Sequence, residues 1–136
     1  MLSSLILLPS AAPVAASIVR IFGHAPVIVL DMERSEREDV LTSVIGAFPG
    51  APNMLRFEDE QVVGTSEAGS SDDPILHFLE MGSNDPDFAV DIVRRFSLGL
   101  LGDDRLLVLM DTDSIRKGPT GKSFGNVTDV VTIAIV

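Results

Sequence analysis

Residues 25–31 read Ala-Pro-Val-Ile-Val-Leu-Asp, an apolar, β-branched run that ends in a carboxylate. A run of this kind is typical of a strand buried on both faces of a sheet. It is preceded by a shorter apolar run at residues 5–8 and by residues 11–22, whose apolar side chains recur at helical spacing. A strand, a helix and a strand in this order favour two parallel strands joined by a crossover helix.

The rest of the chain continues this alternation. Amphipathic helices are predicted at residues 35–48 and 87–100. Strands are predicted at residues 53–57, 61–65, 105–110 and 127–136. Residues 73–80 open with Asp-Pro and are predicted to form a short helix, because aspartate caps helices and proline suits the first helical position.

These elements predict the fold class. We expect one α/β domain over residues 1–136, built as a three-layer sandwich. Its central sheet is expected to have about five mostly parallel strands, flanked by helices on both faces. An antiparallel orientation of the C-terminal strand is left open as an alternative.

The composition limits the classes of function. The chain of 136 residues has no cysteine, which excludes disulfides and thiolate metal sites and fits a reducing compartment. Its net charge of −10 disfavours direct binding in nucleic-acid grooves, because an acidic surface repels phosphates. The same charge suits a basic protein partner or a high-salt cytoplasm. The hydrophobic share of 46% suggests that another chain covers part of the surface.

The sequence predicts a soluble cytoplasmic protein that makes no contact with a membrane. No apolar run reaches the roughly 18 residues that a membrane span requires. The apolar N-terminus has no basic residues at its start and is interrupted by Pro9 and Pro13. We therefore interpret it as folded structure and not as a signal peptide.

Carboxylates follow two of the predicted buried strands. Asp31 ends the run at 27–30, and Asp111 and Asp113 follow the run at 105–110. If the two strands are parallel neighbours, these carboxylates meet at one end of the sheet, where α/β proteins bind ligands. Such oxygen ligands suit Mg²⁺ or Mn²⁺. The alternative is that loops simply begin with acidic residues in a chain this acidic.

The motif Asp111-Thr112-Asp113 resembles one piece of the metal-dependent phosphatases and of topoisomerase-primase domains. It departs from the phosphatase pattern, because Ser114-Ile115 follows where that family has Gly-Thr. The motif also lies close to the C-terminus, whereas the family has it near an N-terminus.

The chain has a single basic cluster, formed by Arg116, Lys117 and Lys122. It lies in a Gly-rich loop whose residues 118–123 are similar to a phosphate-binding P-loop. Arg116 occupies the place of the first glycine of that motif, and a strand follows instead of a helix. A chance match is the alternative. The cluster remains a candidate anion site near the carboxylates.

The last strand is apolar on both faces, so either the sheet order places it inside or a partner covers it. The predicted partner contacts are Phe88, Ile92, Phe96, Val131, Ile133 and Ile135.

The order of the predicted elements resembles that in the core of RecA-type ATPases. It consists of a strand, a helix, an apolar strand ending in Asp31 and a later apolar strand ending in Asp111. The nucleotide-binding residues of that family are missing, which implies a scaffold subunit. We therefore expect a non-enzymatic protein without a cofactor that binds a protein partner or itself, as an assembly factor, a scaffold or an inhibitor of a basic partner. The alternative is a metal-dependent phosphoryl-transfer or phosphodiester-cleaving enzyme, with Asp31, Asp111 and Asp113 as ligands.

Overall fold

The structure is a computed structural model, and it describes residues 4–8, 13–32, 37–48, 52–66, 74–81, 86–110 and 130–135. Its helices are α1 (Val14–Ile21), α2 (Arg37–Ile45) and α3 (Pro86–Leu98). Its strands are β1 (Ser4–Leu8), β2 (Val27–Asp31), β3 (Asn53–Glu58), β4 (Gln61–Ser66), β5 (Leu76–Met81), β6 (Arg105–Met110) and β7 (Val130–Ile135). No helix in these ranges is both long enough and apolar enough to cross a membrane.

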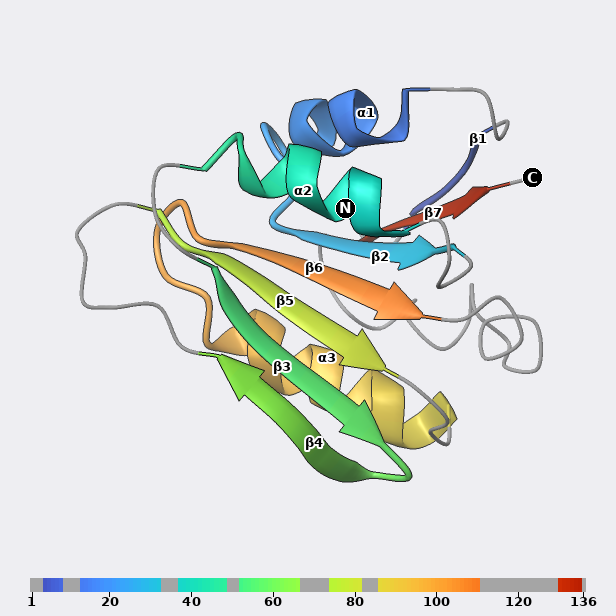
Figure 1. Ribbon diagram of the computed structural model, residues 1–136, viewed down its shortest axis with the longest axis vertical. Coiled ribbons are helices and arrows are strands. Elements are labelled where there is room, and N and C mark those ends of the chain that lie inside the picture. Colours follow the sequence, from blue (N-terminus) through green and yellow to red (C-terminus); the bar gives the residue numbers. More distant parts are fainter. Residues whose placement is uncertain are drawn as a thin grey trace.

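The strands form one sheet in the order β1-β7-β2-β6-β5-β3-β4 (Figure 1). Every neighbouring pair is parallel except β3 and β4, which are antiparallel. The two buried runs that we expected to lie side by side are β2 and β6. They pair in parallel with Val27 opposite Leu106 and Asp31 opposite Met110. The predicted α/β class with a mostly parallel sheet is confirmed.

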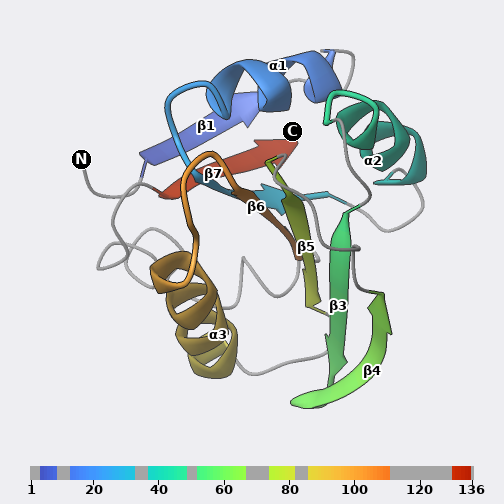
Figure 2. The ribbon, with the colours of Figure 1, turned by 90° about the vertical axis from the view of Figure 1, so that its left-hand side faces the viewer.

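Helices lie on both faces of the sheet (Figure 2). On one face, residues of α1 and α2 pack with Ile28 and Leu30 of β2. On the other face, Ala89 and Val93 of α3 pack with Val29 and other side chains of the second core cluster. Because successive side chains of a strand point to opposite faces, continuous aliphatic strands supply both cores at once.

The predicted helix at residues 73–80 is wrong, because Leu76–Met81 forms the strand β5. This strand lies between β3 and β6 and pairs in parallel with both. Leu76 and Phe78 are buried on one face, and Leu79 and Met81 on the other. Hydrogen bonding on both edges and burial on both faces outweigh the local preference of an Asp-Pro start for a helix.

The C-terminal strand β7 is parallel to both of its neighbours, β1 and β2, so the antiparallel alternative is wrong. Residues 111–129 connect it to β6, and this is more than the dozen or so residues that a parallel crossover requires. The sheet has seven strands, more than the roughly five predicted, because residues 76–81 form the strand β5 and the short strand predicted at residues 61–65 also joins the sheet, as β4.

Candidate functional site

The predicted metal ligands fall at the carboxyl ends of β2 and β6. Asp31 is the last residue of β2 and lies opposite Met110, and the backbone N–H of Met32 donates to the carbonyl of Met110 at 3.4 Å. Asp111, Asp113 and the side chain of Asp31 lie outside the described residues. Within the described ranges, no three His, Asp or Glu side chains are grouped as metal ligands would be. The adjacency of the two strands is confirmed, and the meeting of the three carboxylates stays a prediction.

The segments that follow these two strands lead to opposite edges of the sheet. From β2 the chain continues to α2 and β3, toward the β4 edge, whereas from β6 it continues to β7, toward the β1 edge. Ligands of open α/β sheets bind outside such a divergence, at the carboxyl ends of the strands. The candidate anion-binding residues Arg116, Lys117 and Lys122 lie outside the described residues.

The predicted contacts on β7 are part of this chain's own core. Val131 and Ile133 are 3% and 0% exposed, and their strand lies between β1 and β2. The sheet order therefore covers them, and a partner cannot reach their side chains. For Ile135 the structure describes only the backbone, which pairs with Leu8 of β1.

The predicted contacts on α3 pack against the chain's own sheet. Phe88, Ile92 and Phe96 are half-buried against the core on that face. The ring of Phe88 meets that of Phe57 edge-on, with the ring centroids 5.6 Å apart. This face thus has an intramolecular contact, and a contact with another chain there stays a prediction. Asp91 and Arg95, one turn apart on α3, form an ion pair of 3.0 Å.

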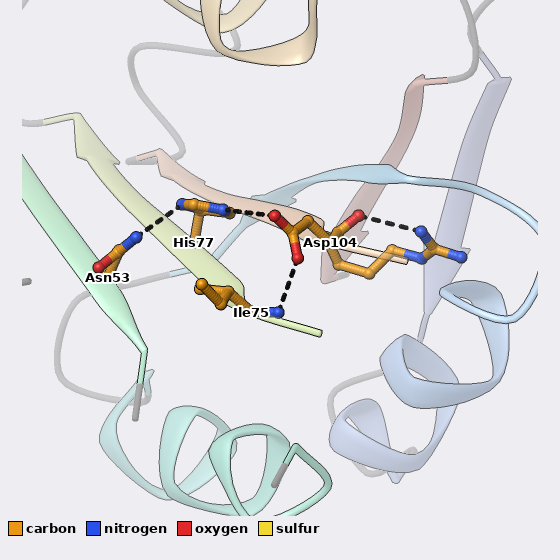
Figure 3. A network of polar contacts seen from close by, with 5 residues as sticks. Asn53, Ile75, His77 and Asp104 are labelled. Atoms are coloured by element: carbon orange, nitrogen blue, oxygen red, sulfur yellow. Dashed lines mark hydrogen bonds and ion pairs between the residues drawn. The ribbon is translucent and has the colours of Figure 1, made fainter. Parts of the chain in front are cut away.

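A polar network joins the amino ends of β3, β5 and β6 (Figure 3). The side-chain amide nitrogen of Asn53 lies 3.3 Å from Nδ1 of His77, and Nε2 of His77 lies 3.5 Å from Oδ2 of Asp104. The other carboxylate oxygen of Asp104 accepts a hydrogen bond from the backbone N–H of Ile75 at 2.8 Å. Sequence reasoning placed His77 on a helix, and nothing local pointed to Asp104 as its partner.

The network engages both nitrogens of His77. The amide of Asn53 lies on the Nδ1 side of the ring and the carboxylate of Asp104 on the Nε2 side. A cavity of about 400 Å³ lies beside it, lined by Asn53, Met54, Leu55, Thr65, Ser66, His77, Phe78 and Phe96. A histidine acts as a general base through a nitrogen that is free to accept a proton. In this arrangement each ring nitrogen of His77 contacts a side chain of a neighbouring segment, so the residue links three parts of the sheet.

Among the described side chains of the sheet, the valines of the edge strand β4 are the most exposed apolar ones. Five of the six residues of β4 are exposed, with Val62 at 54% and Val63 at 52%. Among the described residues no strand pairs with this edge. Cavities adjoin the hairpin on both faces, one of about 220 Å³ reaching Leu41 of α2 and the other, described above, reaching Phe96 of α3.

Sequence reasoning missed this edge, although it predicted the strand. Edge strands are usually guarded by charged side chains, prolines or bulges. The strand Gln-Val-Val-Gly-Thr-Ser has no charge and no proline. A β-bulge protects this edge instead. Val62 lies opposite Phe57 and Gly64 lies opposite Arg56, so that Val63 between them is an extra residue. No local signal marked the edge, because two adjacent valines in an uncharged strand suit a buried strand equally well.

The turn that leads into β4 is acidic and has an unusual backbone. Asp59 and Glu60 have φ of 49° and 64°, the left-handed region. They join two antiparallel strands as a two-residue loop with positive φ at both positions, for which asparagine and glycine are preferred. Just before the turn, Arg56 donates to Glu58 at 2.8 Å and approaches Glu80 at 3.9 Å. The one cation of this hairpin is thus paired with carboxylates of its own chain.

No family model matches the chain, and neither a curated protein nor a solved structure is similar enough to count as a match. Function is therefore inferred from the chain's own geometry.

Proposed function

We propose that this chain is a non-enzymatic cytoplasmic subunit that binds a protein partner by adding a strand to the outer edge of β4. The observation that carries the proposal is the exposure of Val62 and Val63 on an edge strand without charge or proline. Away from the bulge at Val63, such an edge presents backbone donors and acceptors, which a second extended chain can satisfy.

The binding energy would come from two sources. Backbone hydrogen bonds along the edge contribute about 0.5–1.5 kcal/mol each once the exchange with water is counted. The two valines are about half exposed, so covering each would add about 1 kcal/mol of apolar burial. Together these terms suit a reversible complex and not a permanent one.

The proposed mode of binding agrees with the three-layer sandwich expected from the sequence. Support for that architecture comes from the packing of α1 and α2 on one face and α3 on the other. The β3–β4 hairpin lies at the end of the sheet order, beyond the strands that both helical layers cover. Among the described residues no further strand covers its outer edge, as is also true of β1 at the other end of the order, so a further chain can approach it from the side.

A library of displayed peptides in extended conformation tests the proposal while the natural partner is still unidentified. Peptides selected on the wild-type chain are expected to slow amide hydrogen exchange at residues 61–66. They are expected to lose binding to Val63→Lys, because lysine guards edge strands. The matched control is Leu98→Lys, which changes an 82% exposed leucine away from β4 and should bind as the wild type does. A library without binders, or binders that protect other residues, rejects the proposal.

A second candidate function is metal-dependent phosphoryl transfer or phosphodiester cleavage. The register of β2 and β6 supports it, because Asp31 lies opposite Met110 at the end of the sheet from which Asp111 follows. Asp31, Asp111 and Asp113 would supply oxygen ligands for Mg²⁺ or Mn²⁺. Lys117 or Lys122 would neutralise the charge of a phosphate.

Thermal melting with and without Mn²⁺ tests this second function. A metal that binds only the folded state at 100 times its dissociation constant stabilises by about 2.7 kcal/mol, which raises the midpoint by several degrees. Asp111→Asn should abolish this rise. Asp103→Asn, at an exposed position in the turn before β6, should keep it. A wild-type midpoint that neither Mn²⁺ nor Mg²⁺ raises excludes the metal site.

A further inference from the structure

We infer that the strand accepted by β4 inserts one large, uncharged apolar side chain across Gly64 into the cavity between β4 and α2. This inference rests on the proposed function and specifies one residue of the partner. Three features of the described residues lead to it: a glycine that the fold does not require, a cavity beside it with the size of one side chain, and a lining whose charges are already paired.

Gly64 lies inside an edge strand, where glycine is unfavourable because it has no side chain to pack and loses much backbone freedom on folding. Among the described glycines, only Gly102 has a positive φ. A Cβ built on Gly64 would meet nothing closer than the Cβ of Arg56 at 3.8 Å, an ordinary contact. The extra residue of the bulge is Val63, so the bulge does not require a glycine at position 64. Such a glycine is typical of a place that another chain approaches closely.

The face of the sheet that Gly64 leaves open is the face of α2. Gly64 lies opposite Arg56, whose neighbours Leu55 and Phe57 pack with the core on the α3 side. Because successive residues of a strand alternate between faces, position 64 faces α2. A residue of an added strand that lies opposite Gly64 points its side chain to the same face. That side chain would therefore cross a position where β4 has none.

A cavity of about 220 Å³ lies on this face and has Gly64 in its wall. The apolar part of its lining comes from α2, β3, β5 and β6, and consists of Leu41, Met54, Leu55, Phe78 and Leu109. Small-molecule sites usually have about 300–1,000 Å³, whereas an apolar cavity of about 150 Å³ holds a benzene ring. The volume therefore suits one side chain of the size of leucine or phenylalanine and is small for a free ligand.

The charged residues of the lining leave no place for a charged occupant. Arg56 donates to Glu58 at 2.8 Å, and its Nε lies 3.9 Å from a carboxylate oxygen of Glu80. The described lining thus has one cation and one carboxylate, and the two lie against each other. A charge brought into this space would lose water and find no unpaired counter-charge among the described residues, which is costly. The occupant that fits this lining is apolar.

The experiment compares three synthetic peptides of about nine residues, the length of a strand with short flanks. They share alternating valine and threonine and differ only at the central position, which is phenylalanine, alanine or aspartate. We expect the phenylalanine peptide to bind the wild-type chain at least tenfold more tightly than the alanine peptide, because burial of a large apolar side chain contributes that much. The aspartate peptide should bind most weakly. Fluorescence anisotropy measures the affinities, and amide hydrogen exchange locates the bound peptide.

The decisive variant is Gly64→Val, which closes the passage to the cavity. Valine is favoured in strands and its Cβ has room, so this protein should melt at a higher temperature than the wild type. It should bind the phenylalanine peptide no more tightly than the alanine peptide. A folding defect cannot produce that combination. The matched control is Gly99→Ala, after α3, which also replaces a glycine whose added Cβ makes ordinary contacts and should keep the preference for phenylalanine.

The outcomes separate this inference from the proposed function. Equal affinity for the phenylalanine and alanine peptides, or a preference that persists in Gly64→Val, overturns the inference. A Gly64→Val protein less stable than the wild type overturns it too, because the fold itself would then require the glycine. If the peptides protect residues 61–66 without preferring phenylalanine, the proposed function stands and only the side-chain pocket is rejected. If no peptide protects these residues, the proposed function fails as well.

Discussion

Nε2 of His77 lies 3.5 Å from Oδ2 of Asp104, and Oδ1 of the same carboxylate accepts a hydrogen bond from the backbone N–H of Ile75. A single side chain in the turn before β6 therefore holds both the backbone at the start of β5 and a side chain on β5. Both His77 and Asp104 are about one-fifth exposed, so the contacts are partly shielded from water.

Removal of this carboxylate should destabilise the fold. Asp104→Ala leaves the N–H of Ile75 without its acceptor, and we expect a loss of about 1–2 kcal/mol in the free energy of unfolding. Asp104→Asn keeps an oxygen that can accept the hydrogen bond from Ile75, so its free energy of unfolding should fall by less. Urea denaturation of the three proteins measures the difference. Equal losses in both variants would mean that the charge, and not the hydrogen bond to Ile75, stabilises this turn.

Truncation of Ile133 should reveal that β7 is an internal strand. The side chain is 0% exposed, so Ile133→Ala is expected to destabilise the chain by about 2–5 kcal/mol through lost burial and a cavity. Leu98→Ala, at an 82% exposed position, should change stability by less than about 0.5 kcal/mol. Chemical denaturation of the two variants provides the comparison. An Ile133→Ala protein as stable as the wild type would contradict the position of β7.

The edge-on contact of Phe57 and Phe88 should appear as an energetic coupling. A double-mutant cycle with leucine at each position is expected to give about 0.5–1.5 kcal/mol beyond the sum of the single changes. Unfolding free energies of the four proteins measure it. A coupling of zero would indicate that α3 does not use this face against its own sheet, which would favour its role as a contact with another chain.

Removing a side chain at a positive-φ position of one turn and adding one at a positive-φ position of another should change stability in opposite directions. Glu60→Gly relieves left-handed strain and is expected to raise the free energy of unfolding by about 1 kcal/mol. Gly102→Ala introduces the same strain where a Cβ would meet nothing within 4 Å, and should lower it by about 1 kcal/mol. Thermal or urea unfolding of both variants tests the pair. A destabilised Glu60→Gly protein would show that the glutamate side chain contributes more to the fold than its backbone strain costs.

Several features could be predicted from sequence because local pattern alone specifies them. The runs in β2 and β6 are continuous and aliphatic, and such runs have few stable places other than the centre of a parallel sheet covered on both faces. The spacing of Phe88, Ile92 and Phe96 specifies one apolar face on α3, which the structure packs against the core. The acidic charge, the lack of cysteine and the carboxylates after the buried strands are properties of the chain itself.

Other features could not be predicted because they depend on which strands become neighbours. Residues 76–81 favour a helix locally and form a strand only because β3 and β6 hydrogen-bond to both of their edges. The valines of β4 look locally like those of any buried strand, and only the last place in the sheet order leaves them exposed. His77 and Asp104 meet because β5 and β6 pair. Sequence thus determined which segments must be buried, whereas long-range pairing alone decided which edge was left uncovered.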